Sequence, residues 1–334
     1  MDKQTEKKYN YWQWRTLITL MIGYALYYFV RKHFSVVMPA LESELGISKV
    51  QLGLFLTLNG IIYGISRFVN GLLADRFSRK ILMSAGLLLS ALTNFIICFS
   101  PSMNSFVNVL DAEGKATMTL VYIIGSLWVL NGYFQGMGVP PCISLMCHWI
   151  RPSELATKQS IWNASHSIGA GLISVMCGFI LKHYGYSSWQ LCFAIPAAIA
   201  VVGAIALFFT LKDTPSSVGL PEIEDMEKEE GKSQCEVEEN KAKELSGPAF
   251  KKFVNKLVFG NPLIWILAVS NFCIYVVRFT ILDWGTTFLT QFKGMEISAA
   301  GTVVAVSELF CGILGMLLRT VLQKYRKYIF DVQK

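Results

Sequence analysis

Residues 23–39 read GYALYYFVRKHFSVVMP, and residues 275–285 read YVVRFTILDWG. Each stretch is an apolar run that contains an arginine three residues after a tyrosine, and the two arginines, Arg31 and Arg278, are 247 residues apart. Glycines recur at nearly the same spacing, with Gly53 and Gly301 as one pair and Gly64 and Gly312 as another. A tyrosine at this spacing from an intramembrane arginine is uncommon, so its recurrence predicts a duplicated bundle of membrane helices.

The composition agrees with a membrane protein. Of 334 residues, 53% are hydrophobic and only 16% are charged, whereas ordinary soluble domains are about 25% charged. A soluble enzyme is therefore not expected. A helix needs about 20 mainly apolar residues to cross the bilayer. Eight runs meet this length or approach it, at residues 14–40, 50–74, 81–99, 118–148, 159–181, 191–211, 262–290 and 297–318.

Basic residues near the ends of the runs predict their orientation, because lysine and arginine collect on the cytoplasmic side. Clusters precede the first run and follow the second and fourth, which places the N-terminus in the cytoplasm. The segment 212–256 holds eight lysines and eleven acidic residues. We expect a six-helix bundle at 1–211, a charged cytoplasmic linker at 212–260, a partial second bundle of two helices at 261–318, and a basic tail at 319–334.

Arg31 is the first candidate for a binding site. Tyr24, Tyr27 and Tyr28 lie seven, four and three residues before it, so we expect them to share one face with it, as a stripe of hydroxyl groups leading to the guanidinium. An arginine at mid-depth costs roughly 2.5–3.5 kcal/mol on insertion scales, so it normally faces a cavity or a partner. The alternative is that the side chain snorkels to the membrane surface.

Arg278 repeats this arrangement, with Tyr275 three residues before it. Two arginines from equivalent helices would meet at the pseudo-symmetry axis, where transporter sites lie. Guanidinium groups bind phosphate oxygens in a bidentate fork, so the pair suits a divalent anion. The alternative for Arg278 is an ion pair with Asp283 on its own helix, although the spacing of five residues gives poor geometry.

Other polar residues inside the runs are weaker candidates. His166, with Asn163 three residues before it, could respond to the protonation of a phosphate or could be a packing residue. Arg67 follows Tyr63 by four residues, and its side chain could face the site or snorkel to the membrane surface. Lys32 could lie on the face of the helix that carries Arg31 or on another face. In the loop GLLADRFSRK at 71–80, the charged residues Asp75, Arg76 and Arg79 could act as a gate or only fix the topology.

Catalytic and cofactor motifs are absent from the sequence. It contains no P-loop, no HExxH and no Cys-x-x-Cys, so we expect neither an enzyme nor a metal site or cofactor. Several cations lie inside apolar runs rather than on exposed faces, which argues against nucleic-acid binding. The expected partners are the lipid bilayer and a small anion.

The chain resembles the major facilitator superfamily, and within it the organophosphate:phosphate antiporters. The resemblance runs from about residue 12 to 318 and is most specific in the two opening stretches and in YGISRFVNGLLADR, FQGMGVPPC, WNASHSIGAG and DTPSSVGLP. It implies an all-α membrane protein with the major facilitator fold, six helices of the N-terminal bundle and the first two of the C-terminal bundle. In the family, a complete chain has twelve helices around one central site.

The resemblance also implies roles for the candidate residues. Arg31 and Arg278 match the phosphate-binding arginine pair, and His166 matches a substrate-site histidine. Further positions match polar or basic cavity residues, namely Tyr24, Tyr28, Lys32, Tyr63, Arg67, Asn163 and Tyr275. The gating loop of the superfamily is matched by Asp75, Arg76 and Arg79. Val139 stands where the glycerol-phosphate members carry tryptophan, and residues 275–284 look more like the hexose-phosphate branch.

The function that this resemblance implies is exchange of a sugar phosphate for inorganic phosphate across the inner membrane, without a cofactor. One alternative is a receptor that binds external hexose phosphate and signals to a sensor kinase. Another is a non-functional fragment, because eight spans leave the second bundle open. A separately encoded C-terminal half would complete it.

Overall fold

The computed structural model describes residues 3–74, 76–223, 260–310 and 314, which are helical apart from turns, loops and one isolated bridge. The elements are α1 (Lys3–Leu45), α2 (Lys49–Ala74), α3 (Arg79–Phe99), η1 (Ser100–Ser105), α4 (Met118–Gln135), α5 (Val139–Trp149), α6 (Pro152–Tyr184), η2 (Tyr186–Ser188), α7 (Leu191–Thr210), η3 (Pro215–Val218) and α11 (Pro262–Gln291). A helix over Ile297–Phe310 follows α11. Asp75, residues 224–259 of the predicted linker and the predicted tail lie outside the described residues.

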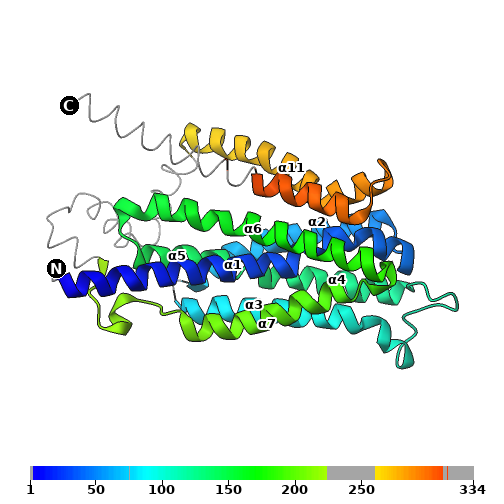
Figure 1. Cartoon of the computed structure of the whole chain (residues 1–334), viewed down its shortest axis with the longest axis horizontal. Helices are drawn as coiled ribbons and strands as arrows, with labels where there is room; N and C mark the ends of the chain where they lie inside the picture. Colours follow the sequence, from blue (N-terminus) through cyan, green and yellow to red (C-terminus); the bar gives the residue numbers. More distant parts are fainter. Residues whose placement is uncertain (1–2, 75, 224–259, 311–313, 315–334) are drawn as a thin grey trace.

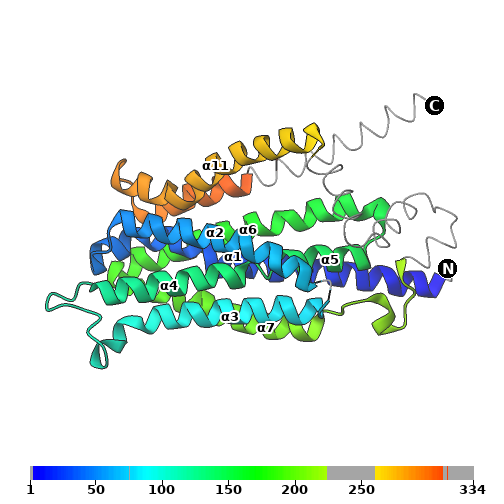
Figure 2. The same cartoon turned by 180° about the vertical axis from the view of Figure 1, so that it is seen from behind.

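Helices α1 to α7 form one bundle, elongated along the helix axes (Figure 1 and Figure 2). Helix α1 packs on α6 and α7, α3 packs on α7, and α2 packs on α4. Two apolar clusters fill the bundle, one that includes Leu17 and Leu87 and one that includes Phe34, Trp128 and Phe193. The expectation of an all-α membrane fold is confirmed.

The fourth predicted span is not one helix. Helix α4 ends at Gln135 and α5 begins at Val139, so the expected run over 118–148 is divided. Pro140 and Pro141 have no N–H to continue the helical hydrogen bonds, and a turn over residues 136–138 precedes them. The two helices lie end to end along the bundle (Figure 1), so they make a single pass.

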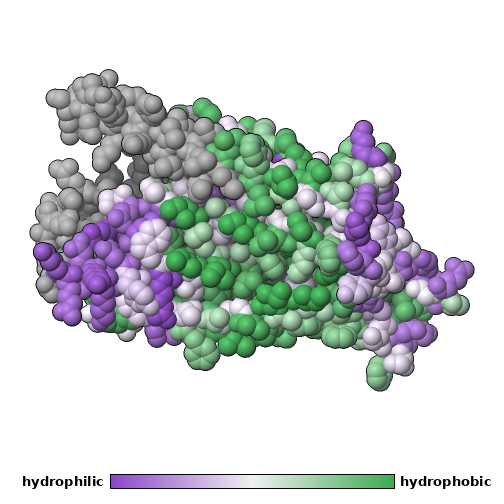
Figure 3. Space-filling view, in the orientation of Figure 1, coloured by the Kyte–Doolittle hydropathy of each residue, from purple (hydrophilic) through white to green (hydrophobic). Residues whose placement is uncertain are grey.

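The surface fits a bilayer. By length and composition, five helical segments in the described part of the chain could cross a membrane. On the face shown in Figure 3, apolar side chains form a band between two hydrophilic ends. Helix α1 extends beyond the predicted span 14–40 at both ends and carries charged residues in its first turns. The eighth predicted span, 297–318, is described to Phe310 and again at Leu314.

Glycine permits a close approach of α6 to α1. A Cβ built on Gly169 would lie 2.5 Å from the carbonyl oxygen and 2.9 Å from the Cα of Ala25, which are backbone atoms that cannot move aside. Gly171, two residues on, packs against Leu309 of the helix that follows α11. The sequence WNASHSIGAG therefore allows α1 and a second helix to lie against α6 on either side of His166.

Gly169→Ala is expected to lower the free energy of unfolding by about 1–3 kcal/mol, because the methyl group forces two backbones apart. The measurement is the thermal unfolding temperature of the purified protein in detergent. Gly60→Ala is the matched control, since a Cβ there meets nothing within 4 Å. Equal unfolding temperatures for the two variants would contradict the role assigned to Gly169.

Helix α11 meets the bundle through its second half. Residues 262–277 are all exposed, and the first side chain that is partly covered is that of Arg278. Further along, Trp284 contacts Gly53 on α2, and the Gln291 amide donates a 2.6 Å hydrogen bond to Glu42 on α1. In both orientations α11 lies nearest the bundle at the end away from the N-terminus (Figure 1 and Figure 2).

Candidate functional site

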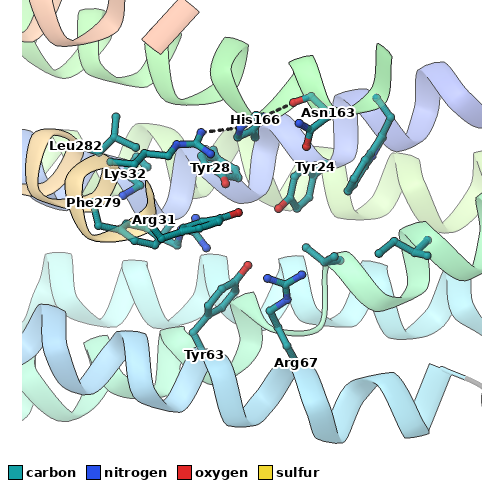
Figure 4. Close-up of a pocket in the computed structure, with 15 residues that line it drawn as sticks. Tyr24, Tyr28, Arg31, Lys32, Tyr63, Arg67, Asn163, His166, Phe279 and Leu282 are labelled. Carbon is teal, nitrogen blue, oxygen red and sulfur yellow. Dashed lines mark hydrogen bonds between the residues drawn. The ribbon is translucent and has the colours of Figure 1, made fainter. Parts of the chain in front are cut away.

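A cavity of about 190 Å³ lies between α1, α2, α6 and α11 (Figure 4). It is lined by every residue that the sequence predicted for substrate binding: Tyr24, Tyr28, Arg31, Lys32, Tyr63, Arg67, Asn163, His166, Tyr275 and Arg278. Apolar side chains complete the lining, including Val139, Ile143, Trp162, Phe279 and Leu282. Residues that are up to 254 positions apart in the sequence are thus brought to one place.

Arg31 is held between aromatic rings. Its guanidinium carbon lies 4.5 Å from the centre of the Tyr28 ring and 4.8 Å from that of Tyr63. Cations are attracted to the faces of such rings. Tyr24 continues the aromatic wall, because it stacks on Trp162 at 4.7 Å and meets the Tyr28 ring edge to face. The guanidinium faces the cavity and not the lipid.

The predicted stripe of tyrosines is only partly correct. The Tyr27 hydroxyl donates a 2.7 Å hydrogen bond to the carbonyl of Met83 on α3 and lies in the core of the bundle. The expectation that Tyr27 shares the face of Arg31 is therefore wrong. Val30, which lies between the two residues, has non-helical backbone angles, so the spacing of a regular helix does not hold from Tyr27 to Arg31.

Arg278 reaches His166 across the cavity. Its Nη2 lies 2.6 Å from His166 Nε2, and the Nδ1–H of His166 donates to the carbonyl of Asn163 (Figure 4). In this tautomer Nε2 carries a lone pair, so the imidazole is neutral and accepts a hydrogen bond from the guanidinium. Both hydrogen bonds fix the direction of the ring.

Glu308 is a site residue that the sequence analysis missed. Its Oε1 accepts hydrogen bonds from Arg278 Nη2 and, at 3.2 Å, from the Ser167 hydroxyl, and it lies 3.9 Å from His166 Nε2. The carboxylate is nearly buried, with 9% of the side chain exposed. An acid inside an apolar run is itself a signal of function. The segment AAGTVVAVSELF shows that signal, and it was overlooked.

Asp283 pairs with Lys32, and not with Arg278 as the sequence left open. Its Oδ1 lies 2.6 Å from Lys32 Nζ, and the Ser35 hydroxyl adds a 3.4 Å hydrogen bond. An ion pair of Arg278 with Asp283 is therefore contradicted, because Arg278 is occupied by Glu308. The Lys32 ammonium also lies 5.1 Å from the ring of Phe279, so Lys32 joins α1 to α11.

The cavity carries an excess of positive charge. Four cations line it, at Arg31, Lys32, Arg67 and Arg278. Asp283 and Glu308 pair with Lys32 and Arg278. Within the described residues, Arg31 and Arg67 have no carboxylate partner, and both lie beside the ring of Tyr63. The two remaining charges match the charge of a divalent anion.

Arg76 and Arg79, two of the three predicted gating residues, lie between α2 and α3 and at the start of α3, whereas Asp75 lies outside the described residues. Arg79 Nε donates a 2.7 Å hydrogen bond to the Ser144 hydroxyl on α5. The first turn of α3 is tied to Asp213, which accepts from the Ser78 hydroxyl at 2.5 Å and from the Lys80 backbone N–H at 2.9 Å. Asp213 begins the motif DTPSSVGLP, and the sequence did not predict its contact with α3. The described residues contain no group of side chains arranged to hold a metal ion.

Comparison with known proteins places this geometry in context. The Probable hexose phosphate transport protein of Chlamydia pneumoniae is 36% identical over 94% of this chain and 65% of its own length. The Glycerol-3-phosphate transporter of Bacillus subtilis is 35% identical over 88% of this chain and 61% of its own length. The Membrane sensor protein UhpC of Escherichia coli is 32% identical over 94% of this chain and 65% of its own length. The chain thus spans just under two thirds of the length of these relatives.

A solved structure shares the fold. The bacterial homologue of the human lysosomal transporter Spinster, in an inward-facing and unoccupied conformation, matches 90% of this chain and 60% of its own length, with a TM-score of 0.65 and 18% identity. The sequence also matches the family model described as Major Facilitator Superfamily over residues 20–330, beyond the boundary that we predicted at 318. With its multi-pass, all-α architecture, the chain belongs to the Major Facilitator Superfamily.

Proposed function

We propose that the chain is a sugar-phosphate carrier of the cytoplasmic membrane, which exchanges its substrate for inorganic phosphate by alternating access. The observation that carries the proposal is the shared cavity of Arg31 and Arg278, which come from the two repeated Tyr-x-x-Arg segments. The excess of two positive charges supports a divalent phosphoryl group as the ligand. No cofactor is required, because the phosphate gradient supplies the driving force.

Different residues of the cavity would contact different parts of the ligand. A guanidinium can donate two parallel hydrogen bonds to a phosphoryl group, so Arg31 and Arg278 would bind it from two sides. His166 and Lys32 contribute polar contacts near Arg278 and Arg31. Tyrosine hydroxyls and Asn163 suit the hydroxyl groups of a sugar. An incoming phosphoryl group has to displace Glu308 from Arg278, which couples binding to a change between α11 and the following helix.

The proposed orientation places the N-terminus in the cytoplasm. Away from the N-terminus, α11 contacts α1 through the ion pair of Lys32 with Asp283, and the segment after α11 contacts the end of α6 through the ion pair of Lys182 with Glu296. Residues 262–277 are exposed. This supports a cavity that opens toward the cytoplasm. Arg76 and Arg79 would then lie at the cytoplasmic end, and we assign a gating role to them and to Asp75, which lies outside the described residues.

The relatives support an organophosphate substrate, and Val139 favours a hexose phosphate. Because the chain is shorter than the relatives, binding and transport are best tested separately. Titration calorimetry on the purified protein should show binding of inorganic phosphate and hexose 6-phosphate, with glycerol 3-phosphate weaker. Glucose is expected to bind at least about 100-fold more weakly, because it carries no negative charge to pair with the cations Arg31 and Arg67 of the cavity. Equal affinity for glucose would overturn the proposal.

Transport is measured in liposomes loaded with labelled inorganic phosphate. External hexose 6-phosphate should release the label, whereas glucose should not. The UhpC relative favours one other candidate function, a receptor for hexose phosphate that signals to a sensor kinase. Binding without release of the label, together with ligand-dependent activity of a partner kinase, would favour the receptor. A separately encoded C-terminal half is a further proposed partner, and its addition would restore exchange to a chain that only binds.

A further inference from the structure

Helix α1 bends at the residue before the cavity arginine. Val30 has φ −93° and ψ 20° inside the helix, whereas the helical value of ψ is about −42°. Sharp bends in helices usually have a proline, a Gly/Ser pair or an inserted side chain as their cause. The proline of α1 is Pro39, nine residues after the bend. Within α1, His33 Nδ1 lies 2.9 Å from the carbonyl oxygen of Phe29 beside the bend, and side chains of neighbouring helices contact the carbonyl oxygen of Val30 itself.

Two asparagines from other helices bind the bent segment. The Nδ2 of Asn131 on α4 donates a 3.0 Å hydrogen bond to the carbonyl oxygen of Val30, and the Nδ2 of Asn94 on α3 donates another at 3.2 Å. Val30, Asn94 and Asn131 are all fully buried. A buried donor without an acceptor costs about 1–3 kcal/mol, so this pairing strongly favours the bent conformation.

The two amides are themselves fixed by a network. The Ser90 hydroxyl donates to Asn131 Oδ1, and Gln135 Nε2 donates a 2.7 Å hydrogen bond to the Ser90 hydroxyl. The Ser90 backbone carbonyl accepts a 2.8 Å hydrogen bond from Asn94. The network leaves Asn131 with its N–H groups directed at α1. These buried polar residues lie outside the cavity lining.

We propose that Asn131 and Asn94 are positioning residues for Arg31. They hold the bend that directs Arg31 between Tyr28 and Tyr63, because ψ of Val30 sets the direction of the chain that follows it. Return of this angle to the helical value would turn residue 31 and the rest of α1 by roughly 60° relative to the first part of the helix. The inference rests on the proposed function only where it concerns phosphate affinity.

The test compares Asn131→Leu with Asn70→Leu. Asn70 is also buried, but its amide donates to Ser66 in its own helix α2 and does not contact α1. Bioorthogonal spin labels at Ile18 and Ser43 report the bend, because these exposed positions lie on either side of Val30. Asn131→Leu is expected to shift the distribution of distances between the labels, and Asn70→Leu is not. An unshifted distribution in Asn131→Leu overturns the proposal, whether or not phosphate binds.

Affinity for inorganic phosphate is the second measurement. Asn131→Leu is expected to raise the dissociation constant about 10-fold, as for one weakened charge-assisted hydrogen bond. In the Arg31→Lys background the same change should have less than a twofold effect, because the residue that it positions is already lost. A full effect in that background would show that Asn131 does not act through Arg31, and would overturn the proposal.

Asn94→Ala is a second variant that guards against a failure of Asn131→Leu to fold. It removes the longer of the two hydrogen bonds and leaves Asn131 in place. It is expected to shift the same distribution in the same direction and to raise the dissociation constant about threefold. If Asn94→Ala binds phosphate like the unmodified chain and leaves the label distances unchanged, the proposal fails.

Discussion

Arg278→Lys is expected to weaken the binding of inorganic phosphate by roughly 10- to 100-fold, and Arg31→Lys by a similar factor. The loss corresponds to about 1.5–3 kcal/mol for a hydrogen bond to a charged group. Lysine keeps the positive charge but offers its donors from one nitrogen, so it cannot form the two parallel bonds of a guanidinium. Titration calorimetry gives the affinity, and release of labelled phosphate from liposomes gives the rate of exchange.

The matched control for this prediction is Arg15→Lys. The Arg15 guanidinium also lies over an aromatic ring, that of Trp12 at 4.4 Å, but it does not line the cavity. The control should bind phosphate like the unmodified chain. Normal affinity and exchange in Arg31→Lys or Arg278→Lys would show that the site has been assigned to the wrong residues.

Glu308→Gln is expected to separate affinity from turnover. Glutamine keeps the shape of the side chain and an oxygen that accepts from Arg278, but it removes the negative charge that competes with the ligand. The dissociation constant for inorganic phosphate should fall about 10-fold. Exchange in loaded liposomes should become slower, because a released phosphoryl group no longer has a carboxylate to replace it on Arg278.

The control for Glu308→Gln is Glu296→Gln. Glu296 pairs with a cation as Glu308 does, since its carboxylate lies 3.0 Å from Lys182 on α6, but this pair is exposed and does not line the cavity. Its loss should change neither affinity nor exchange, as surface ion pairs contribute little. Weaker binding in Glu308→Gln at an unchanged unfolding temperature would mean that the carboxylate holds the ligand site together and does not compete with it.

The charged residues that line the cavity could be predicted from sequence because intramembrane charge is expensive, whereas the roles of the uncharged polar residues came from the family resemblance. That cost makes Arg31 and Arg278 stand out in apolar runs, and the repeated spacing relates them to each other. Glu308 follows the same rule and was within reach of it. The pairing of Lys32 with Asp283 was not, because it depends on how α1 and α11 are rotated against each other.

The bend in α1 shows a different limit of sequence analysis. Helical periodicity relates Tyr27 to Arg31 only while the backbone between them stays helical, and no residue in YYFVRK breaks a helix. The bend comes from the asparagine amides of α3 and α4, whose partners are set by tertiary packing. The break between α4 and α5 has a local cause in Pro140 and Pro141, so closer attention to these prolines would have predicted it.

The two arginines differ in what holds them before a ligand arrives. Aromatic rings flank Arg31, and within the described residues no acid neutralises it, whereas Arg278 already has Glu308 as its counter-ion. An anion can therefore dock on Arg31 without breaking an ion pair, but it must compete for Arg278. This asymmetry implies that binding is sequential. The anion binds first to Arg31 of the first bundle, and Arg278 of the second bundle binds it afterwards, when the ion pair with Glu308 has opened.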